Sequence, residues 1–453
     1  MLTPVQTPKT IPFLAERPLI GSLRAFMHDR LGMLDQLAQV GDVCGFHLGP
    51  IPILLFNKPE HVQTILVEHA YDFSKGKLMH KAIKSNGLFV SEGDFHRKQR
   101  KLMVPMFQPR HITNYVETIV QYGELIAREW ADRATIDLNQ QMISLTMSII
   151  GKVLFDIDML KETDEIGATM AIGFEHTVRK LSEPLMLPEN WPTPYNRRVR
   201  AATVFLEKRI LQMIEERRKQ RVQQQSERLD LLSVLLNAQD EDGSSMSDRQ
   251  VLDECIILLG AGHETTAAAL AWSWYFLCQQ PEIYEQVQQE VQQTLQGRRA
   301  TFEDLARLPL CLQVFKEAMR LYPPAAGIFR EVLAEMTIDG YRVSKGANIL
   351  ISPYTLHRRP EYFPEPEVFD PTRFTPEREK QLPRHAYIPF GVGPRVCIGN
   401  HFALMEGQLL IATIVQQASF RLVPGQQIMP DPVHNLALRP GGRVEVEVQR
   451  QLA

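Results

Sequence analysis

A cysteine near the C-terminal end of the chain lies where a thiol could ionise readily. The stretch reads FGVGPRVCIG, residues 390–399, and its glycines permit positive φ angles and close backbone approach. Such a loop can point its amide N–H groups at the sulfur of Cys397. The helix expected over residues 400–417 adds the partial positive charge of its N-terminus, so both features stabilise a thiolate.

Three roles are open to Cys397. A lone cysteine is most commonly a buried structural thiol. A nucleophilic cysteine would use the same amide-rich loop, but it would need a partnered general base, and the sequence offers none. The role of metal ligand remains.

A second group with chemical potential is Glu264 and Thr265, in a helix expected to run for about thirty residues from Asp248. Its middle is apolar nearly all round, which is typical of a helix that crosses a core. An acid beside an alcohol can deliver protons there. The plainer interpretation is a threonine hydroxyl bonded to a carbonyl one turn earlier. His263-Glu264 also begins a zinc-protease pattern, but position 267 is alanine, so the second histidine is missing.

The elements that must position these residues follow from the hydrophobic pattern. Residues 42–57, DVCGFHLGPIPILLFN, predict a two-stranded hairpin around Gly-Pro. Helical spacing dominates from about 110 to 240, broken by a proline-rich loop at 182–196, and a surface turn is expected at 239–248. After Pro324 the pattern changes to short strands and loops until about residue 395.

Composition excludes several classes of function. The 453 residues, with 44% hydrophobic and 23% charged, are long enough for two domains or for one domain built around a large ligand. A net charge of −3 gives no general attraction to nucleic acid. Five widely spaced cysteines indicate a reducing compartment, and the proline-broken N-terminus offers no membrane span. We therefore expect a cytoplasmic protein without a membrane anchor.

The cysteine stretch carries a resemblance that covers almost the whole chain. Phe390-Gly391-x-Gly393-x-Arg395-x-Cys397-x-Gly399 resembles the haem-binding loop of the cytochrome P-450 monooxygenases at every defined position. The resemblance implies a mainly α, haem-enclosing fold with a smaller β-rich part, formed by residues 1–453 as a single domain. The β-rich part is expected mainly at 40–60, 325–355 and 420–450, and the helical part mainly at 60–325 and 398–418.

The resemblance also implies roles for the loop residues. Cys397 would be the proximal ligand of haem b, Arg395 would meet a haem propionate, and Phe390 and Gly399 would shape the cofactor site. Ala261-Gly262-x-Glu264-Thr265-Thr266 resembles the family's oxygen-activation segment, so Glu264 and Thr265 become the candidate catalytic residues. A thiolate ligand favours O–O cleavage at the iron, which is the chemistry that a monooxygenase needs.

Three cations outside the loop are further candidates to bind propionates. GDFHRKQRKLMVPMF resembles the helix whose aromatic or histidine, and whose arginine four residues later, perform this role, which assigns His96 and Arg100. The family often has tryptophan at the place of His96. Arg330, in PPAAGIFREV, matches another propionate contact. Several cations around two carboxylates are electrostatically sensible.

A structural triad is expected behind the cysteine loop. Glu317 and Arg320 lie three residues apart, hence on one helix face. VFDPTRF, residues 368–374, resembles the loop whose arginine joins such a pair. Glu317, Arg320 and Arg373 would then form a buried network that pins the loop.

The function implied is insertion of one oxygen atom from O2 into a hydrophobic small molecule such as a fatty acid, terpenoid, steroid or polyketide. A haem-thiolate peroxygenase or isomerase and a haem sensor are the alternatives, and the Glu264-Thr265 pair argues against both. Electrons would come from a separate partner such as a ferredoxin or flavodoxin with its reductase, which would dock on basic residues within 96–110. A further candidate wall of the pocket is the loop around Lys77 to Phe89. The candidate pocket residues are Leu259, Ala261, Gly262, Ala325, Ala326, Ile328 and Leu436.

Overall fold

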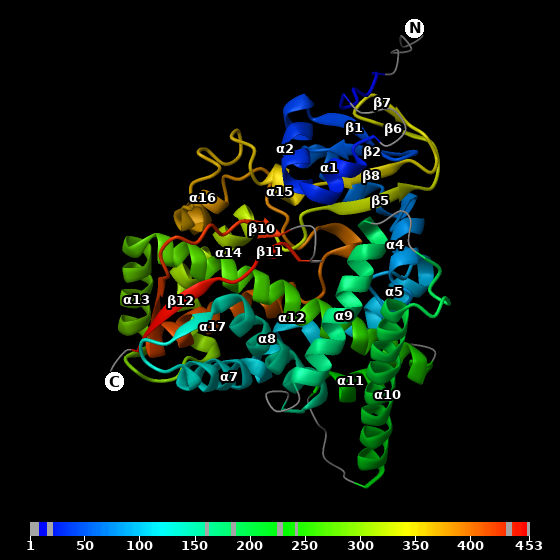
Figure 1. Ribbon diagram of the computed structural model, residues 1–453. Coiled ribbons are helices and arrows are strands. Elements are labelled where there is room, and N and C mark those ends of the chain that lie inside the picture. The colour runs from blue at the N-terminus through cyan, green and yellow to red at the C-terminus, as the bar shows by residue number, and fades with distance from the viewer. Residues whose placement is uncertain are drawn as a thin grey trace.

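The computed structural model describes residues 9–15, 21–158, 163–182, 187–223, 230–240, 243–431 and 437–450. Helices form most of the molecule, and a smaller β-rich part lies at the end that carries the N-terminus (Figure 1). The helices are α1 (Leu23–His28), α2 (Arg30–Val40), α3 (Pro59–Gln63), α4 (Lys77–Ala82), α5 (Gly93–Met103), α6 (Pro109–Ile112), α7 (Val116–Glu129), α8 (Leu138–Phe155), α9 (Thr163–Ser182), α10 (Pro194–Gln223), α11 (Leu231–Asn237), α12 (Asp248–Gln279), α13 (Pro281–Leu295), α14 (Pro309–Leu321), α15 (Pro353–Leu356), α16 (Pro376–Glu379) and α17 (Asn400–Gln417).

The largest sheet has five strands in the order β1-β2-β8-β5-β3. Its first two strands form the predicted hairpin, which turns at Gly49 with φ +60°, and β2 then pairs in parallel with β8. A three-stranded sheet, β4-β12-β9, joins a short strand inside the helical stretch to the C-terminal region. The strands are β1 (Val43–Leu48), β2 (Ile51–Phe56), β3 (Phe73–Ser74), β4 (Thr135–Asp137), β5 (Ile328–Val332), β6 (Met336–Ile338), β7 (Tyr341–Val343), β8 (Asn348–Ile351), β9 (Ala418–Leu422), β10 (Pro430–Asp431), β11 (Arg439–Pro440) and β12 (Glu445–Arg450).

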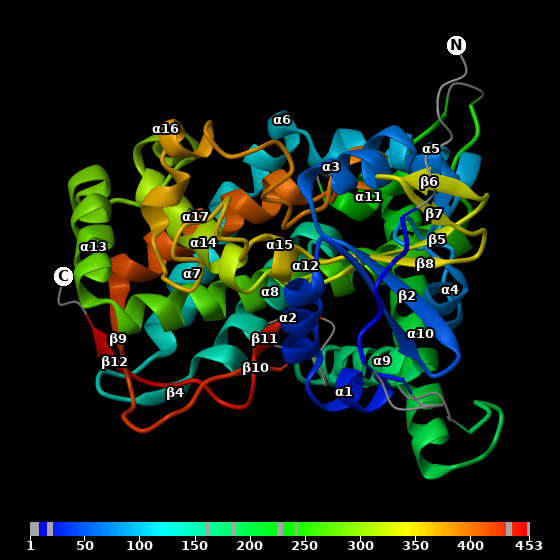
Figure 2. The same ribbon diagram turned by 90° about the horizontal axis from the view of Figure 1, so that it is seen from above.

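Helix α12 crosses the middle of the molecule (Figure 2), as its all-round apolar sequence predicts. It has 32 residues and begins with a capping box between Ser247 and Gln250. Within the described part of the chain it is the one helix long and apolar enough to span a membrane by length and composition, yet 72% of its most apolar window is buried inside the protein. Its apolar surface is therefore used by the core.

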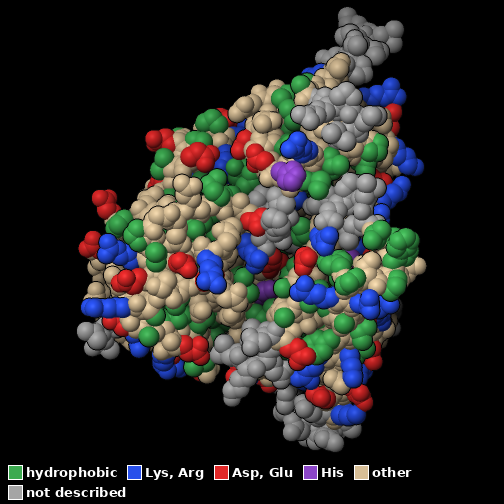
Figure 3. Space-filling view, viewed as in Figure 1, with side chains coloured by type: hydrophobic (Ala, Val, Ile, Leu, Met, Phe, Trp, Pro, Cys, Tyr) green, Lys and Arg blue, Asp and Glu red, His purple; other side chains and the backbone are tan. Residues whose placement is uncertain are grey.

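Helix α17 follows the cysteine loop directly and packs against α7, α14 and α12. Its close approach to α14 depends on Gly407, because a Cβ there would lie 2.5 Å from the ring of Phe315. The cysteine loop is thus attached to one of the most deeply packed helices of the core. On the surface, acidic and basic side chains are interspersed over the face shown in Figure 3, in keeping with the net charge of −3.

Candidate functional site

The loop around Cys397 has the tight geometry that its glycines predict. Gly391 and Gly393 adopt φ values of +66° and +74°, and a short 3-10 turn spans Gly393–Arg395. A Cβ on Gly393 would lie 1.9 Å from the carbonyl oxygen of Leu66, so only glycine fits there. The N–H of Cys397 donates to the carbonyl of Phe390 at 2.9 Å, which closes the loop just before α17.

The thiol of Cys397 lies deep in the molecule and still faces open space. Its side chain is exposed, whereas Cys44, Cys255 and Cys311 are buried and Cys278 is half-buried. Burial raises the pKa of the Cys397 thiol, and the N–H of Gly399 and the charge of Arg100 oppose that rise. A thiol surrounded by protein but open on one side lines an internal cavity, which is where a ligand to a large bound group must be.

Helix α12 shows the same combination of depth and exposure. Ala261 and Thr265 are exposed although the residues around them on the helix are buried or half-buried, and their spacing of four residues puts them on one face. Gly262 is half-buried, and a Cβ there would meet Ile150 at 2.9 Å. Gly262 therefore lets α12 lie close to α8, while the exposed face at Ala261 and Thr265 is where the helix borders open space.

Glu264 and Thr265 point in different directions from the helix. The hydroxyl of Thr265 donates to the carbonyl of Ala261 at 2.8 Å, so the plain back-bonding contact is formed. Its oxygen can still accept a hydrogen bond from a group in the cavity, because a hydroxyl carries two lone pairs. Glu264 is 6% exposed, and the structure gives it a partner interaction within the protein. Their roles as a proton-delivering pair stay a prediction.

A cluster of basic side chains lies around the cysteine loop. It contains the predicted His96, Arg100, Arg330 and Arg395. These side chains are close enough for the charge of one to shift the pKa of another. Burial, and then the charges of Arg395 and Arg100, lower the pKa of His96 to about 4, so its ring is neutral at pH 7. Burial, and then the charge of Arg395, lower the pKa of Arg330 to about 10, and Glu92 opposes this change.

Lys75 is a fifth member of this cluster that the sequence analysis did not select. Burial, then the charges of Arg330 and Arg395, lower the pKa of Lys75 to about 7. Glu92 opposes these charges: its carboxylate contacts Arg395, and its other oxygen accepts the backbone N–H of Lys75 at 2.6 Å. The only sequence signal for Lys75 is its place directly after the short strand β3.

These residues fit a haem. Within the described residues, Glu92 is the carboxylate whose charge acts on Lys75, Arg330 and Arg395, and it cannot offset all the cations of the cluster, so two haem propionates would find cationic partners there. In the same part of the chain no group of three or more His, Cys, Asp or Glu residues could hold a metal ion. Haem would supply the other ligands of an iron bound by Cys397.

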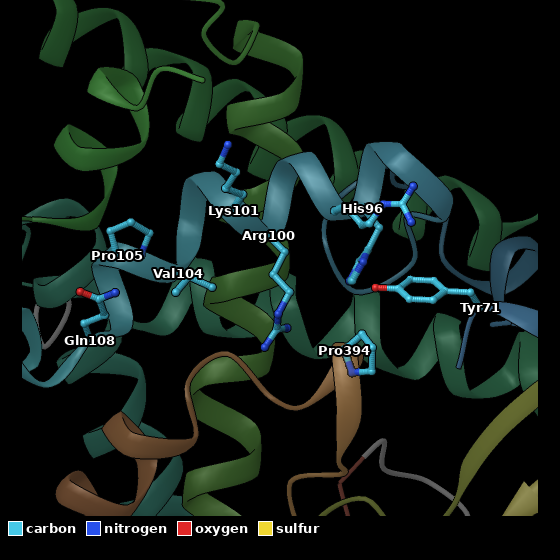
Figure 4. Close-up of a pocket in the computed structure, with 9 residues that line it drawn as sticks. Tyr71, His96, Arg100, Lys101, Val104, Pro105, Gln108 and Pro394 are labelled. Atoms are coloured by element: carbon cyan, nitrogen blue, oxygen red, sulfur yellow. The ribbon is translucent and has the colours of Figure 1, made fainter. Parts of the chain in front are cut away.

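A hollow of about 460 Å³ lies between α5 and the cysteine loop. Figure 4 shows the ring of Tyr71 directed toward His96, and Arg100 pointing from α5 toward the loop that carries Pro394. Lys101 points the other way. The hollow thus joins the predicted propionate residues to the loop. Its lining residues are Tyr71, His96, Arg97, Arg100, Lys101, Val104, Pro105, Gln108 and Pro394.

The structure brings the predicted triad together at full burial. Arg320 binds both oxygens of Glu317 at 2.7 and 2.8 Å, and both side chains are 0% exposed. Arg320 also donates to three carbonyls of the segment that precedes Arg373. Arg373 contributes less to the network, because its Nε lies 3.4 Å from Glu317. Burial raises the pKa of Glu317 despite both cations.

The predicted pocket residues have different environments. Ala325 is exposed, and Ala326 and Ile328 are half-buried, at the entry to β5. Leu259 is 1% exposed, and its carbonyl accepts the ring N–H of His263, so its place in the pocket stays a prediction. Leu436 lies outside the described residues.

Comparisons with known proteins agree with this geometry. The model of the family described as cytochrome P450 matches residues 5–447. The chain is 36% identical to cyclooctatin synthase of Streptomyces melanosporofaciens over 93% of its own length and 92% of that protein. It is 30% identical to pentalenene oxygenase of Streptomyces avermitilis over 91% and 92%.

Solved structures of cytochromes P450 have a similar fold. A retinoic acid bound cyanobacterial CYP120A1 has a TM-score of 0.84 at 25% identity, and the match covers 98% of this chain and 100% of that one. The heme domain of cytochrome P450DA has a TM-score of 0.89 at 24% identity, covers 99% of each chain, and supports the fold alone.

Proposed function

The chain belongs to the cytochrome P450 family, and from that premise we propose that this monooxygenase inserts one oxygen atom from O2 into an unsaturated, largely hydrocarbon molecule of the terpenoid class. Pentalenene oxygenase and cyclooctat-9-en-7-ol 5-monooxygenase, a second relative with 36% identity, support the substrate class by their names. Fatty acids, steroids and polyketides form the wider class that the apolar candidate pocket residues would also admit.

The exposed thiol of Cys397, deep inside the protein, is the observation that carries the proposal. Haem bound there would supply the redox-active iron with its thiolate ligand. The N–H of Gly399 and the charge of Arg100 would favour the ionised thiol, and Arg100, Arg330 and Arg395 would hold the propionates.

The residues of α12 would act on the other side of the cavity. Thr265 holds its hydroxyl toward the carbonyl of Ala261, which fixes the position of Oγ1. We propose that this oxygen hands on protons that enter through Glu264 during O2 reduction. Ala261 would leave room for the substrate, and Gly262 lets α12 lie close to Ile150 of α8.

The test combines spectroscopy and isotope labelling. Pentalenene and dodecanoic acid, used as probes, should move the Soret band of the ferric protein as the iron-bound water leaves. With a ferredoxin and its reductase, the product should carry one atom of 18O from 18O2. Turnover supported by hydrogen peroxide but not by O2 and reductant would favour the peroxygenase alternative. A reduced, carbon-monoxide-bound form without the red-shifted Soret band would overturn the haem-thiolate assignment.

We also propose that a separate acidic electron donor docks on the outer face of α5. Contacts within the chain already involve this face: Lys98 lies 3.4 Å from the carboxylate of Asp240 and donates to Ser244 at 2.7 Å. Lys101 also lies 3.4 Å from Asp240. The patch is therefore partly neutralised by the chain itself, which the sequence pattern could not show.

Asp240→Asn should accelerate reduction of the iron by a ferredoxin and steepen its dependence on ionic strength, because it removes a competing carboxylate. Replacing both Lys98 and Lys101 by Glu should slow reduction and flatten that dependence. The control is Lys219→Glu, on the exposed side of α10, which should change neither. Equal rates in all variants would locate docking elsewhere. A single domain over residues 1–453 and a cytoplasmic location stay predictions of the sequence.

A further inference from the structure

Two consecutive carboxylates near the start of α12 hold the segment between α4 and α5, residues 83–92, which we call the α4–α5 loop. Oδ2 of Asp253 accepts the backbone N–H of Asn86 at 3.0 Å, and Oε2 of Glu254 accepts that of Leu88 at 2.9 Å. The side chains of Asp253 and Glu254 are 4% and 0% exposed. Between these two bonds, a Cβ on Gly87 would lie 2.9 Å from Ile257 and 3.1 Å from the carbonyl oxygen of Asp253, so the loop backbone lies directly on the helix.

The contact of the loop with α12 lies on the face of the helix that also carries Ala261 and Thr265. Ala261 follows Glu254 by seven residues, which is about two helical turns and about 10 Å along the axis, and puts both on nearly the same face of α12. Thr265 continues that face by one more turn. The loop therefore contacts the same face of α12, about two turns before Ala261 and three turns before Thr265, where the proposed function places the substrate.

The other contacts of the loop tie it to the site and to the surface. At its end, Glu92 contacts Arg395 of the cysteine loop. Near its start, Lys84 donates to Glu189 at 2.5 Å, in the segment between α9 and α10. The carboxylate pair on α12 is thus the inner support of a loop that crosses from the haem cations to the surface.

From these contacts we propose that Asp253 and Glu254 are positioning residues that hold the α4–α5 loop as a wall of the substrate cavity and so set the size of ligand admitted. The inference rests on the proposed function, because it needs haem in the cavity beside α12. Asp253 and Glu254 would act on the cavity only through the backbone of the α4–α5 loop.

The chemistry of Glu254 supports a positioning role over a stabilising one. Its Oε1 has no hydrogen-bond partner within the described residues, and burial raises the pKa of the carboxyl to about 7, with the charge of Asp253 raising it further and the N–H of Leu88 opposing the rise. Arg249 pairs with Asp253 at 3.2 Å. A buried carboxyl with an unpaired oxygen destabilises the fold. We therefore assign Glu254 the role of placing the loop.

The test uses Glu254→Met, which keeps the approximate volume and removes the acceptor, and Glu254→Gln, which keeps an acceptor oxygen. Gly87→Ala provides an independent second variant, because its new methyl group would push the loop off α12 without touching either carboxylate. The probes are imidazole and 4-phenylimidazole, which bind haem iron and differ only in size, followed by their Soret shifts.

The matched control is Glu290→Met. Glu290 on α13 also accepts two backbone N–H groups, those of Leu310 at 2.8 Å and Cys311 at 3.1 Å, but it does so at the start of α14 and away from the α4–α5 loop. It therefore reports the loss of a comparable structural contact.

We expect Glu254→Met to weaken binding of 4-phenylimidazole relative to imidazole about three- to tenfold, the effect of one lost hydrogen bond. Gly87→Ala should change the ratio in the same direction, because its methyl group displaces the loop. Hydrogen exchange at the amides of Asn86 and Leu88 should accelerate by a similar factor. Glu254→Gln and Glu290→Met should leave the ratio within about twofold. An unchanged ratio and unchanged amide exchange in Gly87→Ala, or a shift in Glu290→Met as large as in Glu254→Met, would overturn the proposal. A wild-type protein without a thiolate Soret band would instead contradict the proposed function.

Discussion

The clearest quantitative prediction concerns Glu406, a buried carboxyl on α17 that the sequence pattern does not single out. Its side chain is 1% exposed, and its Oε2 has no hydrogen-bond partner within the described residues. Burial raises its pKa from an ordinary 4.5 to about 8, and a hydrogen bond with Thr266 of α12 opposes that rise. Glu406 is therefore protonated at pH 7 in the folded enzyme.

The direction of the pH dependence follows from where the proton is held. Above about pH 4.5 the unfolded chain releases this proton, whereas the folded protein keeps it until about pH 8. The free energy of unfolding therefore falls as the pH rises across this window and levels off above it. The window spans about 3.5 pH units, and each is worth about 1.4 kcal/mol, so up to about 5 kcal/mol is lost by pH 8.

Glu406→Gln removes this loss because an amide does not ionise. The variant keeps a polar group for Thr266, so we expect it to resemble wild type at pH 5 and to gain about 1 kcal/mol of relative stability per pH unit up to pH 8. Urea unfolding of the haem-loaded proteins at fixed pH values measures the difference. Glu285→Gln, on the exposed side of α13, is the control and should give a flat difference. Parallel wild-type and Glu406→Gln curves from pH 5 to 8 would refute the reasoning.

Three further predictions concern the site itself. Cys397→Ala should abolish the red-shifted Soret band of the reduced carbon-monoxide complex, and persistence of that band would identify another ligand. Thr265→Ala should retain haem and substrate binding but divert electrons to peroxide, lowering product per reductant consumed about tenfold or more; an unchanged ratio would remove Oγ1 from proton delivery. Arg320→Ala should lower the free energy of unfolding by about 3–5 kcal/mol, and Arg373→Ala by less, because Glu317 keeps its bidentate partner in the second variant only; equal losses would contradict the geometry.

The parts of the site that could be predicted from sequence are those that local geometry determines. The glycines around Cys397 need no distant partner to form their turn, and the structure shows positive φ at Gly391 and Gly393. The length and burial of α12 follow from its own apolar pattern. The pairing of Glu317 with Arg320 follows from their spacing of three residues on one helix.

The parts that could not be predicted depend on residues far apart in the chain. Glu254 meets Leu88 across 166 positions, and no periodicity in either segment marks the pair. Lys75 joins the cation cluster because β3 pairs with β5, which carries Arg330. The basic residues of α5 were expected to be available to a partner, yet Asp240 already contacts Lys98. In each case the chemistry of a charged residue depends on its partner, which only the tertiary fold specifies.

The polar residues of α12 each contact a different neighbour, which explains why a core helix tolerates them. Glu254, Ala261 and Thr265 lie on one face, where Glu254 is covered by the α4–α5 loop, whereas Thr266 is turned by about 100° from Thr265 and meets Glu406 of α17. One face of the helix therefore carries the exposed residues Ala261 and Thr265, and a neighbouring face is fixed to the helix that follows Cys397. Because Thr265 and Thr266 are adjacent in the chain, a shift of α17 would be passed to the hydroxyl in the cavity through a single peptide unit. If Thr265 delivers protons as proposed, a substitution that breaks the contact between Glu406 and Thr266 should lower the product formed per reductant consumed, although it lies outside the cavity.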